Sequence, residues 1–153
     1  HVGIGVPGGQ FSTKAGPMMA SSDRFQITVK GRQTHGARPW DGVDPVVTAA
    51  QIVIGLQTIA SRQLDVTAAP SIISVGRIEG GVRNNVIPDQ VEFEGTIRTF
   101  DPAMRETIHE RIENTARSIG TGYSWNTSAA RRSCRCGMAR ADRGACPMRL
   151  WPA

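Results

Sequence analysis

The feature that most constrains this chain is a turn followed by an alternating strand, between Gly80 and Arg98. Adjacent glycines and adjacent asparagines favour a tight turn, because these residues tolerate the left-handed backbone that such turns need. After the turn, Val91, Phe93 and Ile97 alternate with polar residues, which is the period-two pattern of a strand with one buried face. Such a strand requires partner strands and an apolar layer, which the rest of the chain must supply.

Three other segments are candidates for partner strands. Phe25, Ile27 and Val29 alternate with polar residues before Gly31, and residues 71–78 are rich in isoleucine and valine. Residues 122–128 could supply a weaker fourth strand. The segment 71–78 is apolar and carries only Arg77 as a charged residue, so as a sheet edge it would invite pairing with another chain.

Two helices are expected, one over residues 43–62 and one from Asp101 to Gly120. Each begins with an Asp-Pro pair, which is typical of a capped first turn. The second helix has one apolar stripe and a charged outer face. The first has two neighbouring apolar stripes, more than a helix lying on one sheet needs. One consists of Val43, Val46, Val47, Ala50, Val53 and Ile54, and the other of Ala49, Ile52, Leu56 and Ile59.

This order of elements predicts an α+β fold with ferredoxin-like β-α-β-β-α-β topology. The sheet would be antiparallel with four strands in the order 4-1-3-2, and both helices would cover one face. Strand 71–78 would then lie at an edge of the sheet. The second apolar stripe of helix 43–62 would remain available for a partner.

The last thirty residues differ from the rest of the chain. Residues 124–153 contain six arginines, one acid (Asp142) and all three cysteines, Cys134, Cys136 and Cys146, and they account for the whole net charge of +5. They have no periodicity, so we expect a non-native or disordered tail rather than a nucleic-acid-binding surface. The three cysteines are one ligand short of an ordinary zinc site. No apolar run approaches the length of a membrane span, and no signal peptide is visible, so a cytoplasmic location is expected.

Several motifs together resemble the lid (dimerisation) domain of the aminoacylase/carboxypeptidase family of two-metal amidohydrolases, in particular its hippurate hydrolase and auxin-conjugate hydrolase branch. The resemblance covers the chain to about residue 122, and its motifs are residues 1–3, 16–21, 35–39, 42–45, 85–88 and 95–101. It implies that residues 1–22 are a remnant of, or a linker from, a missing catalytic domain, that 23–123 are the lid domain, and that 124–153 lie outside it.

The resemblance also implies roles for individual residues. His35 would contact the scissile carbonyl of a neighbouring active site. Arg98 would bind the substrate carboxylate, and Asn85 would complete the same pocket. His1 matches a metal ligand of the full-length enzyme, which would hold two divalent ions, zinc or manganese. Trp40 stands where this branch often carries a second histidine.

The other metal ligands and the general base of that family are missing here, so we expect no cofactor in this fragment and no catalysis by it alone. The implied whole is a homodimer, formed through strand 71–78 and helix 43–62, that hydrolyses small N-acyl or N-aroyl amino acids without nucleic-acid or membrane partners. Strand geometry places His35 and Asn85 at one end of the sheet and Arg98 at the other.

Two other functions remain open from the residues alone. The first is a free-standing ferredoxin-like module for dimerisation or small-ligand regulation. The second is a ferredoxin-like RNA-binding domain, which would need aromatic side chains on the exposed sheet face for base stacking. Phe25 and Phe93 alternate toward the buried face instead, so the second alternative is the weaker one.

Overall fold

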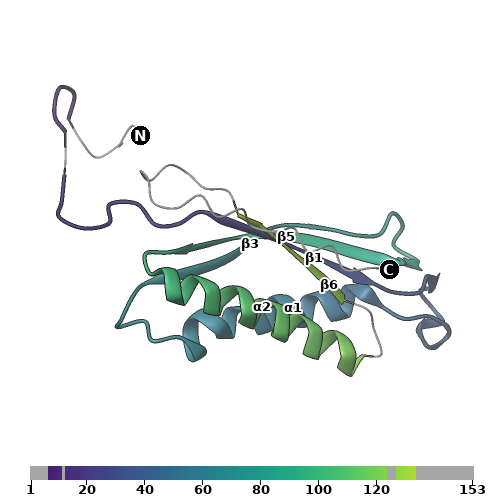
Figure 1. Cartoon of the computed structure of the whole chain (residues 1–153). Coiled ribbons are helices and arrows are strands. Elements are labelled where there is room, and N and C mark those ends of the chain that lie inside the picture. The colour runs from purple at the N-terminus through teal and green to yellow at the C-terminus, as the bar shows by residue number, and fades with distance from the viewer. Residues whose placement is uncertain (1–6, 12, 124–126, 134–153) are drawn as a thin grey trace.

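Figure 1 shows a computed structural model of the chain, which describes residues 7–11, 13–123 and 127–133. The chain is an α+β protein with antiparallel strands and two long helices, as the sequence predicts. In chain order the elements are β1 (Asp23–Lys30), β2 (Thr34–His35), the 3-10 helix η1 (Pro39–Asp41), α1 (Pro45–Thr58), the π-helical turn η2 (Ile59–Gln63), β3 (Ser71–Glu79), β4 (Val86–Ile87), β5 (Gln90–Thr99), α2 (Pro102–Gly122) and β6 (Thr127–Ser133).

The main sheet has the strand order β3-β5-β1-β6, and every neighbouring pair is antiparallel. Helices α1 and α2 lie side by side on one face of this sheet (Figure 1). Strand β3 forms one edge, and its outer side has no partner strand among the described residues. Its pairing with β5 shifts register between Val75 and Arg77, so β3 is regular only over its first half.

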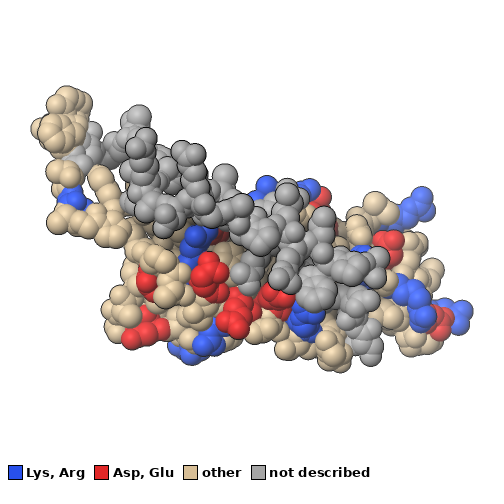
Figure 2. All heavy atoms as spheres, viewed as in Figure 1, with Lys and Arg blue, Asp and Glu red and all other residues tan. Residues whose placement is uncertain are grey.

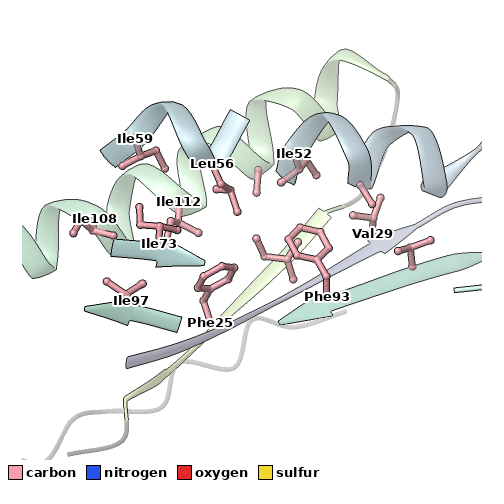
Figure 3. Close-up of a cluster of buried hydrophobic side chains, with 14 of the residues drawn as sticks. Phe25, Val29, Ile52, Leu56, Ile59, Ile73, Phe93, Ile97, Ile108 and Ile112 are labelled. Carbon is pink, nitrogen blue, oxygen red and sulfur yellow. The ribbon is translucent and has the colours of Figure 1, made fainter. Parts of the chain in front are cut away.

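The hydrophobic core fills the space between the sheet and the two helices. Ile27 of β1 lies opposite Phe93 of β5, and both side chains are fully buried. Figure 3 shows side chains of the strands and of the helices pointing toward one another across this layer. The alternating pattern of the sequence therefore identifies the buried face of the central strands correctly. The largest core residues are Phe93, Ile27, Ile52, Leu56, Ile59, Ile97 and Ile108.

Both helices begin at a capping aspartate followed by proline. The Asp44 carboxylate accepts a hydrogen bond from the backbone N–H of Val46 at 2.8 Å, and the Asp101 carboxylate accepts one from that of Met104 at 2.8 Å. These contacts satisfy N–H groups that have no partner within the helix. At Gly55 the helices approach closely, because a Cβ there would lie 2.8 Å from the Ile119 side chain.

The two apolar stripes of the first helix have different environments. Ala49, Ile52 and Leu56 are buried against the sheet. The other stripe faces outward, and its exposed members include Val46, Val47, Ala50 and Ile54. This helix face is therefore apolar and is not covered by any other part of the described residues.

The structure corrects two predicted boundaries. The helix expected over residues 43–62 ends as an α-helix at Thr58 and continues as the π-helical turn η2. The last strand runs from Thr127 to Ser133 instead of 122–128, because α2 extends to Gly122 and occupies the expected start. The sheet thus includes part of the segment that we assigned to the tail. Residues 134–153, with the three cysteines, lie outside the described residues.

A buried ion pair fastens the start of β1 to the first turns of α2. The Asp23 side chain is completely buried, and its carboxylate oxygens accept hydrogen bonds from Arg105 Nε at 2.7 Å and from an Arg105 terminal nitrogen at 2.5 Å. Nearby, the backbone N–H of Ser21 donates to the carbonyl of Thr99 at 2.7 Å. Asp23 also lies opposite Ser133 in the β1–β6 ladder, so the first strand begins where the last one ends.

None of the helices in the described part of the chain has the length and apolar character of a membrane span.

Two glycines in the sheet offer a matched test of the packing. A Cβ at Gly95 would lie 2.2 Å from the ring of Phe25 and 2.3 Å from the Ser74 carbonyl, whereas a Cβ at Gly76 would meet nothing within 4 Å. We expect Gly95→Ala to lower the free energy of unfolding by about 1–3 kcal/mol through overpacking, and Gly76→Ala to change it by less than about 0.5 kcal/mol. Urea denaturation of both variants measures the difference. Equal stabilities would contradict the close contact of Phe25 with Gly95.

Candidate functional site

A two-stranded ladder outside the main sheet brings His35 and Asn85 together. His35 of β2 pairs with Val86 of β4, and the backbone N–H of Gly36 donates to the Asn85 carbonyl at 2.8 Å. Gly36 permits this approach because a Cβ there would lie 3.1 Å from the same oxygen. Both His35 and Asn85 are exposed. The structure thus places them at one end of the sheet, in agreement with the strand geometry.

One nitrogen of the His35 ring accepts a hydrogen bond from the backbone of its own loop. The backbone N–H of Ala37 donates to His35 Nδ1 at 3.1 Å. An N–H group can only donate, so Nδ1 must carry a lone pair, and the neutral imidazole therefore has its proton on Nε2. Among the described residues, Nε2 has no hydrogen-bond partner, so its N–H can donate a hydrogen bond to a group outside the loop. An exposed N–H donor is the group that a developing oxyanion requires.

The loop that carries His35 is closed by several contacts. Arg32 and Val43 exchange two backbone hydrogen bonds of 3.0 Å at its base. Within it, Arg38 forms an ion pair with Asp41 at 2.8 Å, and the Thr34 hydroxyl donates to the Arg38 carbonyl at 3.1 Å. At Gly42 a Cβ would lie 2.4 Å from the Thr34 side chain. These restraints fix the loop relative to the β2–β4 ladder.

Arg98 lies at the other end of β5. It pairs with Ile72 of β3 and is exposed on the sheet face opposite the helices. From Gln90 to Arg98, β5 spans about 26 Å at roughly 3.3 Å per residue. Because side chains cannot bridge that separation, the structure does not bring Arg98 together with His35 and Asn85 within one chain.

The centre of the same sheet face carries a network of opposite charges. Glu94 forms ion pairs with Arg24 and, at 3.1 Å, with Arg77. The hydrogen bond from Arg24 holds the pKa of Glu94 below its usual value, and the charge of Arg77 adds to the effect. Figure 2 shows acidic and basic side chains interspersed over the visible side of the molecule. The described part of this view thus shows mixed charge and not the basic patch of a nucleic-acid-binding surface.

Sequence reasoning missed a hollow of about 400 Å³ at the His35 end of the sheet. Gln33, Val86 and Pro88 contribute to its lining. Three carboxylates, Glu79, Asp89 and Glu92, also line it, so it is unsuited to a carboxylate ligand. No short motif predicts this hollow, because its residues come from three separate segments, Gln33, 79–82 and 86–92.

The described residues do not provide a metal site. Among them, no three histidine, cysteine, aspartate or glutamate side chains are grouped as metal ligands. A stable site for a divalent ion needs about four ligands for zinc and more for larger ions. The residues described here therefore do not fit a resident metal, and His1, the predicted ligand, lies outside them.

Comparison with known proteins gives one family. The model of the peptidase dimerisation domain matches residues 20–123. The N-acetylcysteine deacetylase of Bacillus subtilis is 41% identical over 118 residues, which are 77% of this chain and 31% of that protein. The N-acyl-L-amino acid amidohydrolase of Geobacillus stearothermophilus is 38% identical over 119 residues, 78% of this chain and 32% of that protein.

A solved structure of the same family of peptidases is also similar to this chain. The dinuclear metal binding peptidase of the M20 family from Bacillus subtilis is 35% identical, with a TM-score of 0.60, over 79% of this chain and 28% of that one. This chain therefore spans about a third of the length of the relatives that it matches.

The contact from Ala37 to His35 makes a specific prediction. We expect neutral His35 to be the Nε2–H tautomer, because Nδ1 accepts the backbone hydrogen bond. The ¹⁵N chemical shifts of the imidazole, measured by NMR at alkaline pH, distinguish the two tautomers. A predominant Nδ1–H form would show that the Ala37 contact is absent in solution.

Proposed function

This chain belongs to the peptidase dimerisation domain family, and from this membership we propose that it is the dimer-forming and substrate-binding domain of a metal-dependent amidohydrolase. The parent enzyme would hydrolyse N-acyl or N-aroyl amino acids in the cytoplasm. The observation that carries the proposal is an exposed His35 whose Nδ1 accepts a backbone hydrogen bond, on a loop that Gly36 joins to the Asn85 carbonyl. The names of the relatives support the substrate class, since two of them act on N-acyl amino acids or N-acetylcysteine.

We propose that the topology is the ferredoxin-like one, because the strand order β3-β5-β1-β6 with two helices on one face of the sheet agrees with it. In this arrangement β3 is an edge, and the backbone N–H and C=O groups on its outward side pair with no other strand of the described residues. Strand β3 also exposes Ile72, at 56% of its surface. An edge strand of this kind is a template for another strand.

We infer that the dimer joins β3 to its copy and sets α1 against α1 across a two-fold axis. The regular half of β3, residues 71–75, is the part suited to pairing, because the register shift and the Arg77–Glu79 ion pair follow it. On α1, the exposed side chains of Val46, Val47 and Ile54 would be covered in the same contact. A two-fold interface is self-complementary, as one strand and one helix paired with their own copies require.

Within this dimer each active site would draw on two subunits. Arg98 would bind the carboxylate of the substrate, with the two-pronged geometry of a guanidinium. Asn85 would complete the pocket, and His35 would donate from Nε2 to the carbonyl oxygen of the amide as negative charge develops there. Since Arg98 lies far from the other two within one chain, we propose that His35 and Asn85 serve the site of the partner while Arg98 serves its own.

The remaining chemistry belongs to the missing part of the parent enzyme. Two divalent metal ions, zinc or manganese, would there supply activation of the attacking water. His1 would be one of their ligands. The described residues of this chain bind and orient the substrate in this scheme and hold no metal.

The proposed interface predicts the behaviour of the isolated chain. We expect a dimer that Ile54→Lys converts to a monomer, because a charge would enter an apolar helix contact. Ile54 is 62% exposed, so the variant should keep the stability of the fold. Sedimentation equilibrium measures the mass. Ser118→Lys, at an exposed position of α2, is the matched control and should remain dimeric. A wild-type monomer at high concentration would refute the interface.

The shared site predicts complementation in the parent enzyme. We expect His35→Ala and Arg98→Ala each to lower kcat/KM roughly 100-fold, as the loss of one transition-state donor typically does. Refolding the two inactive chains together should restore activity, because one site of each mixed dimer then has both residues intact. Random mixing predicts about a quarter of the wild-type activity. Mixed dimers that form, shown by two different affinity tags, without any return of activity would refute the shared site.

A further inference from the structure

A large aromatic side chain stands exposed on the loop that carries His35. Trp40 belongs to the short helix η1 and is 73% exposed. Tryptophan is seldom left this open to water, because its ring buries a large apolar area when it finds a partner. Exposed aromatic residues of this kind are frequent energetic centres of binding sites.

The turn that presents Trp40 is held on both sides. The backbone N–H of Asp41 donates to the Arg38 carbonyl at 3.1 Å, and that of Gly42 donates to the Pro39 carbonyl at 3.2 Å. The Arg32 guanidinium donates to the Asp41 carbonyl at 3.0 Å. The backbone that carries Trp40 is therefore fixed, and binding there loses little backbone entropy.

Trp40 and Asn85 belong to different segments, and each segment is tied to the residues around His35 by a backbone hydrogen bond. Asn85 adjoins His35 across the β2–β4 ladder, at the Gly36 hydrogen bond. Trp40 follows His35 along the chain, in a turn folded back by the hydrogen bond from the Arg38 N–H to the His35 carbonyl at 2.8 Å. An amide substrate also has two sides at its carbonyl, the amino acid with its carboxylate and the acyl group. In the proposed function Asn85 contacts the amino-acid side of the substrate, which bears the carboxylate. Trp40 is then the candidate to contact the acyl group on the other side of the carbonyl.

We propose that Trp40 determines specificity for the acyl group: its indole packs against an apolar acyl or aroyl group while His35 contacts the carbonyl that bears it. The inference rests on the proposed function, since it needs an N-acyl amino acid as the substrate. An aromatic acyl group gains most from such a contact, because two rings can stack in an offset or edge-to-face arrangement. An acetyl group is too small to cover the indole.

The test compares two substrates that differ only in the acyl group, N-benzoyl-L-alanine and N-acetyl-L-alanine, in the complete enzyme that carries this domain. We expect Trp40→Ala to lower kcat/KM for the benzoyl substrate about tenfold, and for the acetyl substrate less than about twofold. Trp40→Phe should keep most of the benzoyl activity, because it preserves an aromatic face. Tyr123→Ala removes an aromatic residue that is 48% exposed at the end of α2, and it should affect neither substrate.

The outcomes separate this inference from the function on which it rests. A wild-type enzyme that hydrolyses neither substrate overturns the proposed function and the inference with it. A wild-type enzyme that hydrolyses them, with Trp40→Ala changing both equally or neither, overturns the inference alone. Loss of the dimer in Trp40→Ala, measured by sedimentation, would assign Trp40 to the subunit interface and would also overturn it. The melting temperature of each variant shows whether the fold is kept.

Discussion

The antiparallel pairing of β1 with β5 is the constraint on which the rest of the structure depends. It sets Ile27 of β1 opposite the buried ring of Phe93 of β5. It also sets Phe25 opposite Gly95, where the absence of a side chain leaves room for the Phe25 ring. A shift of one residue would turn every core side chain of one strand to the open face. The same register fixes the ends of the strands, and with them the positions of Arg98 and of the β2–β4 ladder.

Short-range patterns account for most of what the sequence predicts correctly. Period-two alternation identifies the central strands, and the Asp-Pro pairs identify both helix starts because capping is a local interaction. The two stripes of α1 are correct as well, one buried and one exposed. The predicted end of the second helix at Gly120 and the predicted start of the last strand at residue 122 are both wrong, because Gly120 lies buried within α2 and the helix continues to Gly122. The hydrogen bond to His35 Nδ1 and the acidic hollow depend on loop geometry that the residues alone do not fix.

The two ends of the sheet carry charged side chains of opposite sign. Carboxylates line the hollow near His35, and a negative substrate group would be repelled from it. At the other end Arg98 is exposed on a strand otherwise rich in acidic residues. Between them, the ion pairs of Glu94 with Arg24 and Arg77 neutralise the middle of the face. Under the proposed function, the guanidinium that binds the anion and the imidazole that contacts the carbonyl lie at opposite ends of β5, so the proposed site draws on two chains.

The antiparallel contact of Asp23 with Ser133 has a consequence for how this unit could be carried by other proteins. The polypeptide enters and leaves the sheet at neighbouring positions, and the entry point is anchored by Arg105. A unit with adjacent entry and exit can be inserted into a surface loop of a host domain without separating the two sides of that loop. The domain is thus suited to evolutionary transfer as a cassette.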